Sequence, residues 1–223
     1  RYVGNPINTV QIFNQIGVDE IAILDVNAYK DGINYEYLSQ IAIEAFVPLA
    51  YGGGISSVDE AKKIINLGFE KVILCSSFLD GDHISKEISE TLGASSCALC
   101  INLKRGFISS NYYLYDHRLK RKLRKFDANI LLELEELGFG EVIVQSVDSD
   151  GTWDGYSREI IDLLDAIDSP IPIDYVGGIN STREIKELLD KKHISAVGIS
   201  SLVLFQRKNQ GVVVSFPNDE EVM

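Results

Sequence analysis

Short apolar runs alternate with amphipathic stretches along most of the chain. The apolar runs are rich in β-branched residues, which is typical of strands, whereas the amphipathic stretches repeat apolar residues at helical spacing. A Ser57–Glu60 capping box and an Asn5-Pro6 turn mark two helix starts, and 112–115 predicts a hairpin arm. Strands are expected at 20–24, 48–51, 71–74, 96–103, 141–145, 172–176 and 196–199, and helices at 8–16, 35–45, 57–67, 83–92, 128–137, 157–167 and 181–190.

The seven predicted strands are apolar at nearly every position, so both of their faces should be buried, as in a parallel sheet. A regular alternation of such strands with helices predicts an α/β fold, and a (βα)8 TIM barrel requires eight strands. The only methionine is Met223, so we expect that a segment before Arg1 is missing here and carries the first strand. A doubly wound sheet is the alternative.

An internal repeat supports the barrel. The stretch from Gly53-Gly54-Ile55 to Cys75-Ser76-Ser77 reappears without a gap as Gly177-Gly178-Ile179 to Ile199-Ser200-Ser201. Each copy predicts a strand, a glycine turn, a helix, a second strand and a turn with small hydroxyl side chains. We therefore expect one barrel domain over residues 1–223, built from half-barrel repeats at about 1–93 and 94–223.

Charge excludes some partners. The chain of 223 residues has a formal net charge of −12, which disfavours nucleic acids and anionic membranes. One basic cluster interrupts this pattern, and we interpret it as a solvated loop and helix face, with a substrate-phosphate site as the alternative. The cluster consists of Arg118, Lys120, Arg121, Lys122, Arg124 and Lys125.

The cysteines point to a reducing compartment. The chain has three of them, and the single Cys97-x-x-Cys100 pair has no second ligand pair and lies inside an apolar strand. We therefore expect free thiols, and neither a metal nor another cofactor. No apolar run reaches membrane-spanning length and no signal peptide opens the sequence, so we expect a soluble, cytoplasmic protein.

The repeated glycine and hydroxyl turns are candidate phosphate sites. Glycines after a strand let the backbone approach an anion, and N–H groups at a following helix start point toward it. Small hydroxyl side chains after the next strand can complete each site. The alternative is that the glycines only allow tight packing of helix against strand. The candidates are Gly53, Gly54 and Ser76 in the first copy, and Gly177, Gly178, Ser200 and Ser201 in the second.

Carboxylates for acid–base chemistry follow two strands. A turn at 148–152 carries Asp148 and Asp150, and Asp25 ends the strand at 20–24. Such chemistry on a sugar phosphate would use paired carboxylates across the barrel mouth. The candidate on the fifth barrel strand is Asn102, whose amide can orient a substrate but cannot exchange a proton near neutral pH.

Four segments resemble one family. Residues 17–25, the Tyr51-Gly52-Gly53-Gly54-Ile55 turn, the stretch 146–152 and the pair Gly177-Gly178 are similar to the cyclase subunit of imidazole glycerol phosphate synthase, and the likeness extends over essentially the whole chain. The ends, at 1–10, 205–206 and 211–217, resemble a paralogous branch that accompanies sugar amidotransferases in surface-polysaccharide synthesis. In the family, a glutaminase subunit docks on the bottom of the barrel and releases ammonia, which passes through the barrel to the top.

The resemblance assigns roles to residues of this chain. It implies that one catalytic aspartate lies on the missing first strand and that the other is replaced by Asn102. It also implies that a charged ring gates ammonia at the barrel bottom, with Glu20, Lys71 and Glu141 as three of its four members; a salt-bridge plug that only closes the barrel is the alternative. The implied phosphate-binding residues are Gly54, Cys75 in place of the usual asparagine, Ser76, Asp150, Gly151, Gly178, Ser200 and Ser201.

These implications leave three functions open. In the first, the chain delivers ammonia from a glutaminase to a separate sugar-modifying amidotransferase, and its own cyclase chemistry is impaired. In the second, it is an active cyclase, a lyase that converts ammonia and a phosphoribosyl intermediate to imidazole glycerol phosphate. In the third, it is a related phosphoribosyl isomerase. We expect a phosphorylated small-molecule ligand. Asn102 together with the chain ends favours the first function, whereas the kept phosphate turns favour the second or a shared ancestry.

Overall fold

The computed structural model of the chain describes residues 4–107, 111–167, 169 and 171–205. The chain divides into two compact units, 1–99 with 137–140 and 100–136 with 141–223, each described here only over the residues just given. The chain passes from the first unit to the second inside strand β4 (Cys97–Arg105), so that this strand contributes to both.

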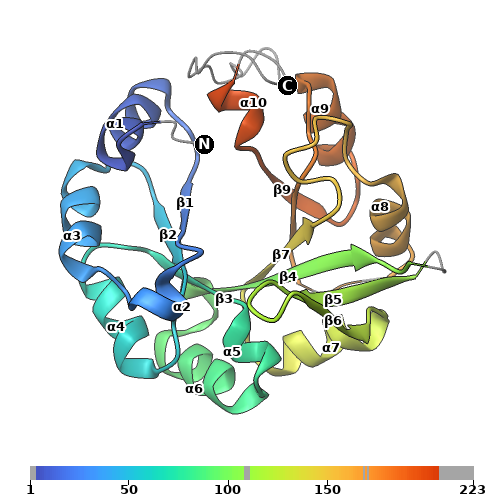
Figure 1. The fold of residues 1–223 in the computed structure, drawn as a ribbon, viewed down its shortest axis with the longest axis horizontal. Coiled ribbons are helices and arrows are strands. Elements are labelled where there is room, and N and C mark those ends of the chain that lie inside the picture. Colours follow the sequence, from blue (N-terminus) through green and yellow to red (C-terminus); the bar gives the residue numbers. More distant parts are fainter. Residues whose placement is uncertain (1–3, 108–110, 168, 170, 206–223) are drawn as a thin grey trace. The chain divides into compact units, whose positions relative to one another are not determined.

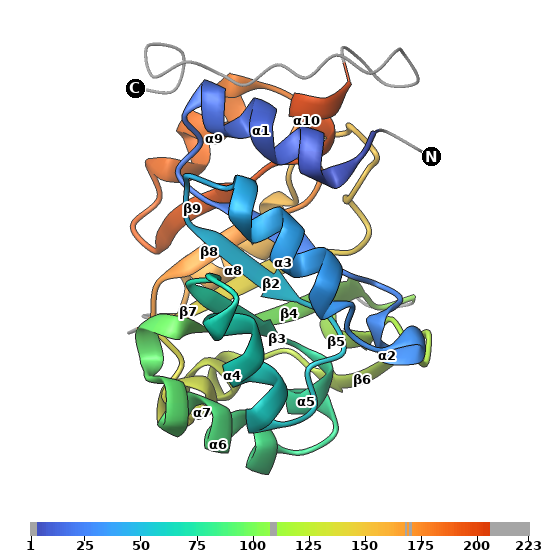
Figure 2. The ribbon, with the colours of Figure 1, turned by 90° about the vertical axis from the view of Figure 1, so that its left-hand side faces the viewer.

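The first unit contains strands that pair in parallel in chain order, β1–β2–β3–β4. The helices α1, α3, α4 and α6 lie on one side of β1–β3, as Figures 1 and 2 show. The elements are α1 (Pro6–Ile16), β1 (Ile21–Leu24), α2 (Ala28–Asp31), α3 (Tyr35–Glu44), β2 (Leu49–Gly52), α4 (Val58–Asn66), β3 (Lys71–Leu74), α5 (Ser76–Leu79), α6 (Asp82–Leu92) and the 3-10 turn Ala94–Ser96.

Local sequence explains where these helices begin. Asn5 accepts a hydrogen bond from the N–H of Ile7 at 3.0 Å, and Pro6 takes the first helical position, where a missing N–H costs nothing. At α4 the hydroxyl of Ser57 accepts from the N–H of Glu60 at 3.3 Å. The Glu60 carboxylate reaches one residue further back than a capping box requires and accepts from the N–H of Ser56 at 2.8 Å.

The second unit continues the parallel sheet in the order β4–β7–β8–β9 and adds an antiparallel hairpin on β4. Helices α8 and α9 lie on one side of β7–β9 (Figure 1). The elements are β5 (Tyr112–Asp116), β6 (Arg121–Lys125), α7 (Ala128–Glu136), β7 (Glu141–Ser146), α8 (Arg158–Asp165), β8 (Ile173–Val176), α9 (Thr182–Leu189), β9 (Ile194–Gly198) and α10 (Ser201–Leu204).

Each unit has an apolar core between its strands and helices. In the first, Ile41, Leu49, Ile64 and Val72 are almost completely buried, and in the second so are Leu134, Val144, Ile161 and Leu188. Burying aliphatic side chains of this size contributes roughly 2 kcal/mol each and is the main stabilising term in a fold of this kind.

The α/β class and the parallel strands are confirmed. A doubly wound sheet would reverse its strand order at a switch point, and no reversal occurs among the described strands, which follow one another in the order of a (βα)8 barrel. The hairpin arm is confirmed as β5 and β6. The eighth strand before Arg1 and the half-barrel boundary stay predictions, and the chain ends at 1–3 and 206–223 lie outside the described residues.

The loop predicted for the basic cluster is confirmed at Arg118 and Lys120, but the predicted helix face is wrong. Arg121–Lys125 form strand β6, and Arg118 and Lys120 lie in the turn that leads into it. This strand pairs only with β5 among the described strands, so it stands at the outer edge of the hairpin, where lysine and arginine are common because they discourage further strand pairing. A strand is recognised in a sequence by alternating apolar and polar residues, and consecutive charged residues do not show this alternation.

Candidate functional site

The second-copy phosphate residues come together in one small cavity. The loops after β7, β8 and β9 enclose about 20 Å³, enough for one small polar group rather than a whole ligand. Its lining includes all six residues predicted for this unit: Asp150, Gly151, Gly177, Gly178, Ser200 and Ser201.

Two of the residues around this cavity are held by the surrounding chain. The amide of Gln145 donates a 2.9 Å hydrogen bond to Asp150. Ser200 immediately precedes α10, and its carbonyl oxygen accepts from the N–H groups of Val203 and Leu204 at 3.2 and 3.1 Å. The position where a phosphate is predicted is therefore surrounded by an exposed carboxylate, two hydroxyl side chains and glycine backbone.

Close packing by itself also demands these glycines. Gly178 has a φ of 87°, and a Cβ there would overlap the carbonyl oxygen of Gly155 and lie 2.7 Å from Cβ of Ser149. A Cβ at Gly177 would lie 2.8 Å from the carbonyl oxygen of Ser146. The packing alternative therefore explains why glycine stands here, and phosphate binding stays a prediction.

The first unit repeats this arrangement. A Cβ at Gly53 would lie 2.5 Å from the carbonyl oxygen of Asp25, and one at Gly54 2.8 Å from the backbone of Ala28. Cys75 precedes α5 as its N-cap residue, and Ser76 is the first residue of that four-residue helix. Both glycine turns thus pack against the loop that follows the neighbouring strand.

Asp25, predicted as an acid–base group, is used by its own loop. Its Oδ1 accepts hydrogen bonds from the N–H groups of Asn27 and Ala28 at 3.0 and 3.1 Å. These bonds hold the turn that leads into α2. A catalytic role for Asp25 stays a prediction.

Asn102 lies on β4 and is only 6 % exposed. The thiol of Cys100, two residues earlier on the same face of the strand, donates to its Oδ1 at 3.7 Å, which is a weak contact. A buried amide in this place supplies hydrogen bonds but no proton at neutral pH.

Two members of the predicted charged ring form an ion pair. Nζ of Lys71, the first residue of β3, lies 2.7 Å from the carboxylate of Glu20, which directly precedes β1. Their side chains are 22 % and 31 % exposed, so the pair is partly shielded from water. The third member, Glu141, is the first residue of β7 and belongs to the other unit.

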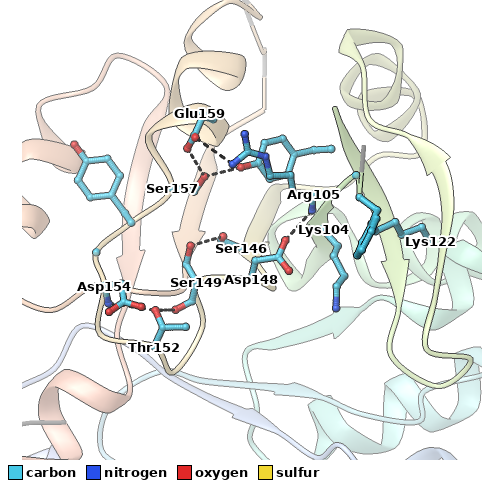
Figure 3. Close-up of a pocket in the computed structure, with 15 residues that line it drawn as sticks. Lys104, Arg105, Lys122, Ser146, Asp148, Ser149, Thr152, Asp154, Ser157 and Glu159 are labelled. Carbon is cyan, nitrogen blue, oxygen red and sulfur yellow. Dashed lines mark hydrogen bonds and ion pairs between the residues drawn. The ribbon is translucent and has the colours of Figure 1, made fainter. Parts of the chain in front are cut away.

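A larger cavity in the second unit was missed by sequence reasoning. It encloses about 520 Å³ between the end of β4, the hairpin and the β7–α8 loop (Figure 3). Lys104, Arg105 and Lys122 line it from β4 and β6, whereas Asp148, Asp154 and Glu159 line it from the loop and the start of α8. Only strand pairing brings Lys104 and Lys122 together, so no spacing in the sequence marks them.

The β7–α8 loop is the wall between the two cavities of this unit. Asp150, Gly151 and Trp153 line the small cavity, and Asp148, Ser149, Thr152 and Asp154 line the large one. The carboxylates of the turn at 148–152 therefore do not act as a pair on one ligand.

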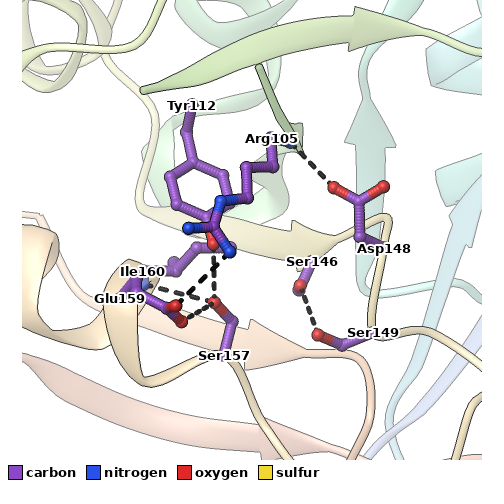
Figure 4. Close-up of polar contacts among 8 residues, drawn as sticks. All are labelled: Arg105, Tyr112, Ser146, Asp148, Ser149, Ser157, Glu159 and Ile160. Carbon is purple, nitrogen blue, oxygen red and sulfur yellow. Dashed lines mark hydrogen bonds and ion pairs between the residues drawn. The ribbon is translucent and has the colours of Figure 1, made fainter. Parts of the chain in front are cut away.

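A buried hydrogen-bond network fixes the far end of this loop. Tyr175 accepts from the N–H of Ser157 at 2.8 Å, and Oγ of Ser157 lies 3.0 Å from the hydroxyl of Tyr112 (Figure 4 shows Ser157 with Tyr112). Burial raises the pKa of Tyr175 to about 12, so that its hydroxyl stays neutral. This side chain positions the start of α8 and has no reason to titrate during a reaction.

Among the described helices, none is long and apolar enough to cross a membrane.

Comparison with known proteins agrees with this architecture. A family model described as histidine biosynthesis protein matches residues 1–209. A Leptospira borgpetersenii protein named "Putative imidazole glycerol phosphate synthase subunit HisF" is 36% identical over 227 residues, which cover 100% of this chain and 89% of the relative. The Petrotoga mobilis "Imidazole glycerol phosphate synthase subunit HisF" is 32% identical over 199 residues, or 88% of this chain and 77% of that protein. The chain therefore belongs to the histidine biosynthesis protein family and is a HisF-like protein.

Proposed function

We propose that this chain is a HisF-like subunit that receives ammonia from a glutaminase and passes it on for amidation of a sugar by a separate enzyme, with its own cyclase chemistry impaired. The observation that carries the proposal is the buried amide of Asn102 at the position where the family resemblance implies a catalytic aspartate. General acid–base catalysis needs a group that gains and loses a proton near pH 7, and an amide does not.

The charged pair at the strand starts supports the ammonia-delivering part of this role. Glu20 and Lys71 are held at 2.7 Å in a partly shielded place, as a gate for a small neutral molecule would require. At this exposure, a purely structural ion pair would contribute only about 1 kcal/mol or less to the free energy of unfolding.

Active cyclase chemistry is the second candidate. It is favoured by the small cavity, which gathers Asp150, Gly178 and Ser201, three of the residues predicted to bind phosphate. The names of the relatives, imidazole glycerol phosphate synthase subunits, also fit this candidate.

The decisive experiment compares the full-length protein with the Petrotoga mobilis HisF. Both are assayed for cyclase turnover with ammonium salt and the phosphoribosyl substrate, and for stimulation of their glutaminase partners. We expect the glutaminase to be stimulated and cyclase turnover to be at least about 100-fold below that of the relative, since this is the lower range for loss of an acid–base group. Turnover within tenfold of the relative would establish the second candidate instead.

Lys71→Ala should uncouple the two reactions. The substitution leaves Glu20 without its cation, so we expect less ammonia to be delivered per glutamine hydrolysed, while the free energy of unfolding changes by about 1 kcal/mol or less because the pair is partly solvated. The product that incorporates the ammonia and the glutamate released by the glutaminase are measured in the same reaction.

Lys86→Ala is the matched control. It removes a lysine from an exposed pair with Glu90 on α6, at 3.9 Å, and should leave the ratio of ammonia delivered to glutamine hydrolysed unchanged. An unchanged ratio in Lys71→Ala as well would rule out the gate and leave the salt-bridge plug.

A further inference from the structure

The large cavity of the second unit has the dimensions of a ligand site. Its volume of about 520 Å³ falls within the usual range for small-molecule pockets, roughly 300–1,000 Å³. It shares no lining residue with the small cavity to which the phosphate prediction refers. A ligand here would therefore occupy a site of its own.

The loop side of this cavity is already satisfied by its own hydrogen bonds. Ser146 donates to Ser149 at 3.0 Å, and the backbone N–H of Arg105 donates to Asp148 at 2.7 Å (Figure 4). The guanidinium of Arg105 also lies 3.6 Å from the carboxylate of Glu159. These contacts leave the carboxylates of Asp148 and Glu159 engaged with the chain. The third carboxylate on this side is that of Asp154.

The opposite side carries two lysines that strand pairing brings to one face of the hairpin. Lys104 on β4 is directly opposite Tyr113, and Lys122 on β6 is directly opposite Tyr115. Directly paired residues point to the same face, and so do residues two apart on a strand. Both lysines therefore lie beside Tyr115, and Nζ of Lys104 is 4.5 Å from the centre of its ring.

Neither ammonium is neutralised within the described part of the chain. No carboxylate there forms an ion pair with Lys104 or Lys122, although the chain as a whole has a net charge of −12. The charge of Lys104 acts on its surroundings, because after burial it is the next largest cause that lowers the pKa of His117. Two lysines that line one cavity without an ion-pair partner among the described residues favour an anionic ligand there.

An aromatic side chain completes the lining. Phe107 follows β4, lines the cavity and is fully exposed, with a relative exposure of 100%. An exposed aromatic ring at the rim of a pocket offers a face on which a planar ring of a ligand can stack, worth about 1–3 kcal/mol for a nucleobase. Lysine ammonium groups bind phosphate as point charges.

We propose that the cavity between the hairpin and the β7–α8 loop binds an organic phosphate that carries a planar ring, in the manner of a nucleoside diphosphate, with the phosphates on Lys104 and Lys122 and the ring on Phe107. This site is additional to the two phosphate sites predicted at the glycine turns. The β7–α8 loop also lines the small cavity, so a ligand here contacts the same loop that carries Asp150 and Gly151.

The test is calorimetric titration of the full-length protein with ADP, with inorganic pyrophosphate and with adenosine. We expect ADP to bind more tightly than either part alone. Lys104→Ala and Lys122→Ala should each lower the affinity for ADP by about tenfold or more, which is the usual loss for a hydrogen bond to a charged group. Phe107→Ala should lower the affinity for ADP and leave the affinity for pyrophosphate unchanged.

Lys125→Ala is the matched control, because Lys125 lies on the same strand, opposite Tyr113, but does not line the cavity. It should leave ADP binding within twofold of wild type. The proposal is overturned if ADP does not bind, if the two lysine variants bind it like wild type, or if Lys125→Ala weakens it equally. Tighter binding of a single-stranded RNA oligonucleotide than of ADP in the same titration would also overturn it, because the face would then be a nucleic-acid surface.

Discussion

Gly178→Ala should destabilise the protein by about 2–5 kcal/mol. The residue has a φ of 87°, a conformation that costs an L-residue about 1–2 kcal/mol. The added methyl group would also overlap the carbonyl oxygen of Gly155 and press on Ser149 at 2.7 Å, and overpacking of this kind costs a further 1–3 kcal/mol or so. Urea unfolding of the full-length protein measures the loss.

Gly151→Ala separates the cost of the backbone conformation from the cost of overpacking. Gly151 lines the same small cavity and has a φ of 70°, but a Cβ there would meet no atom within 4 Å. Only the backbone cost remains, so we expect a loss of about 1–2 kcal/mol. Equal losses for both variants would mean that the close approach to Gly155 does not determine why glycine is needed at position 178.

Asn102→Asp should raise ammonia-dependent cyclase turnover by at least about 100-fold if the chemistry was lost at this position alone. The new carboxyl would be buried to the same degree as the amide, which is only 6 % exposed, and burial raises the pKa of a carboxyl toward neutrality. Such a group can both give and take a proton near pH 7. Steady-state turnover with saturating ammonium salt is the measurement.

Asn102→Leu is the comparison of similar size that cannot exchange a proton, and it should show no gain. Thermal unfolding of both variants shows whether either has failed to fold. A folded Asn102→Asp protein that still stimulates its glutaminase but stays at background turnover would show that cyclase chemistry is missing at more than one position. That outcome strengthens the ammonia-delivering role.

The positions of strands and helices could be predicted because their signals are local. The capping of α1 by Asn5 and the apolar runs of β2 and β3 depend on neighbouring residues, and the structure places them within one or two residues of the expectation. The short helices α2, α5 and α10 were not predicted, because four residues are too few to show a helical period.

The candidate site was only partly predictable. The second-copy phosphate residues do line one cavity, and Glu20 and Lys71 do form a pair. The sequence could not show that Asp25 is bound by the turn that follows it, since an aspartate in a loop can accept hydrogen bonds from nearby backbone N–H groups instead of acting as an acid. It also could not show that Asp148 and Asp150 line different cavities.

The sequence by itself determined the α/β class and the repeated glycine turns, because both depend on short-range patterns of residues. It also determined the family, because the chain is similar to its relatives over most of its length. Only the tertiary structure decided which partners those residues meet. The close approach of Gly178 to Gly155, and the pairing that brings Lys104 and Lys122 beside Tyr115, join residues that are far apart in the chain. Such contacts depend on how strands pair and loops pack, which no local pattern encodes.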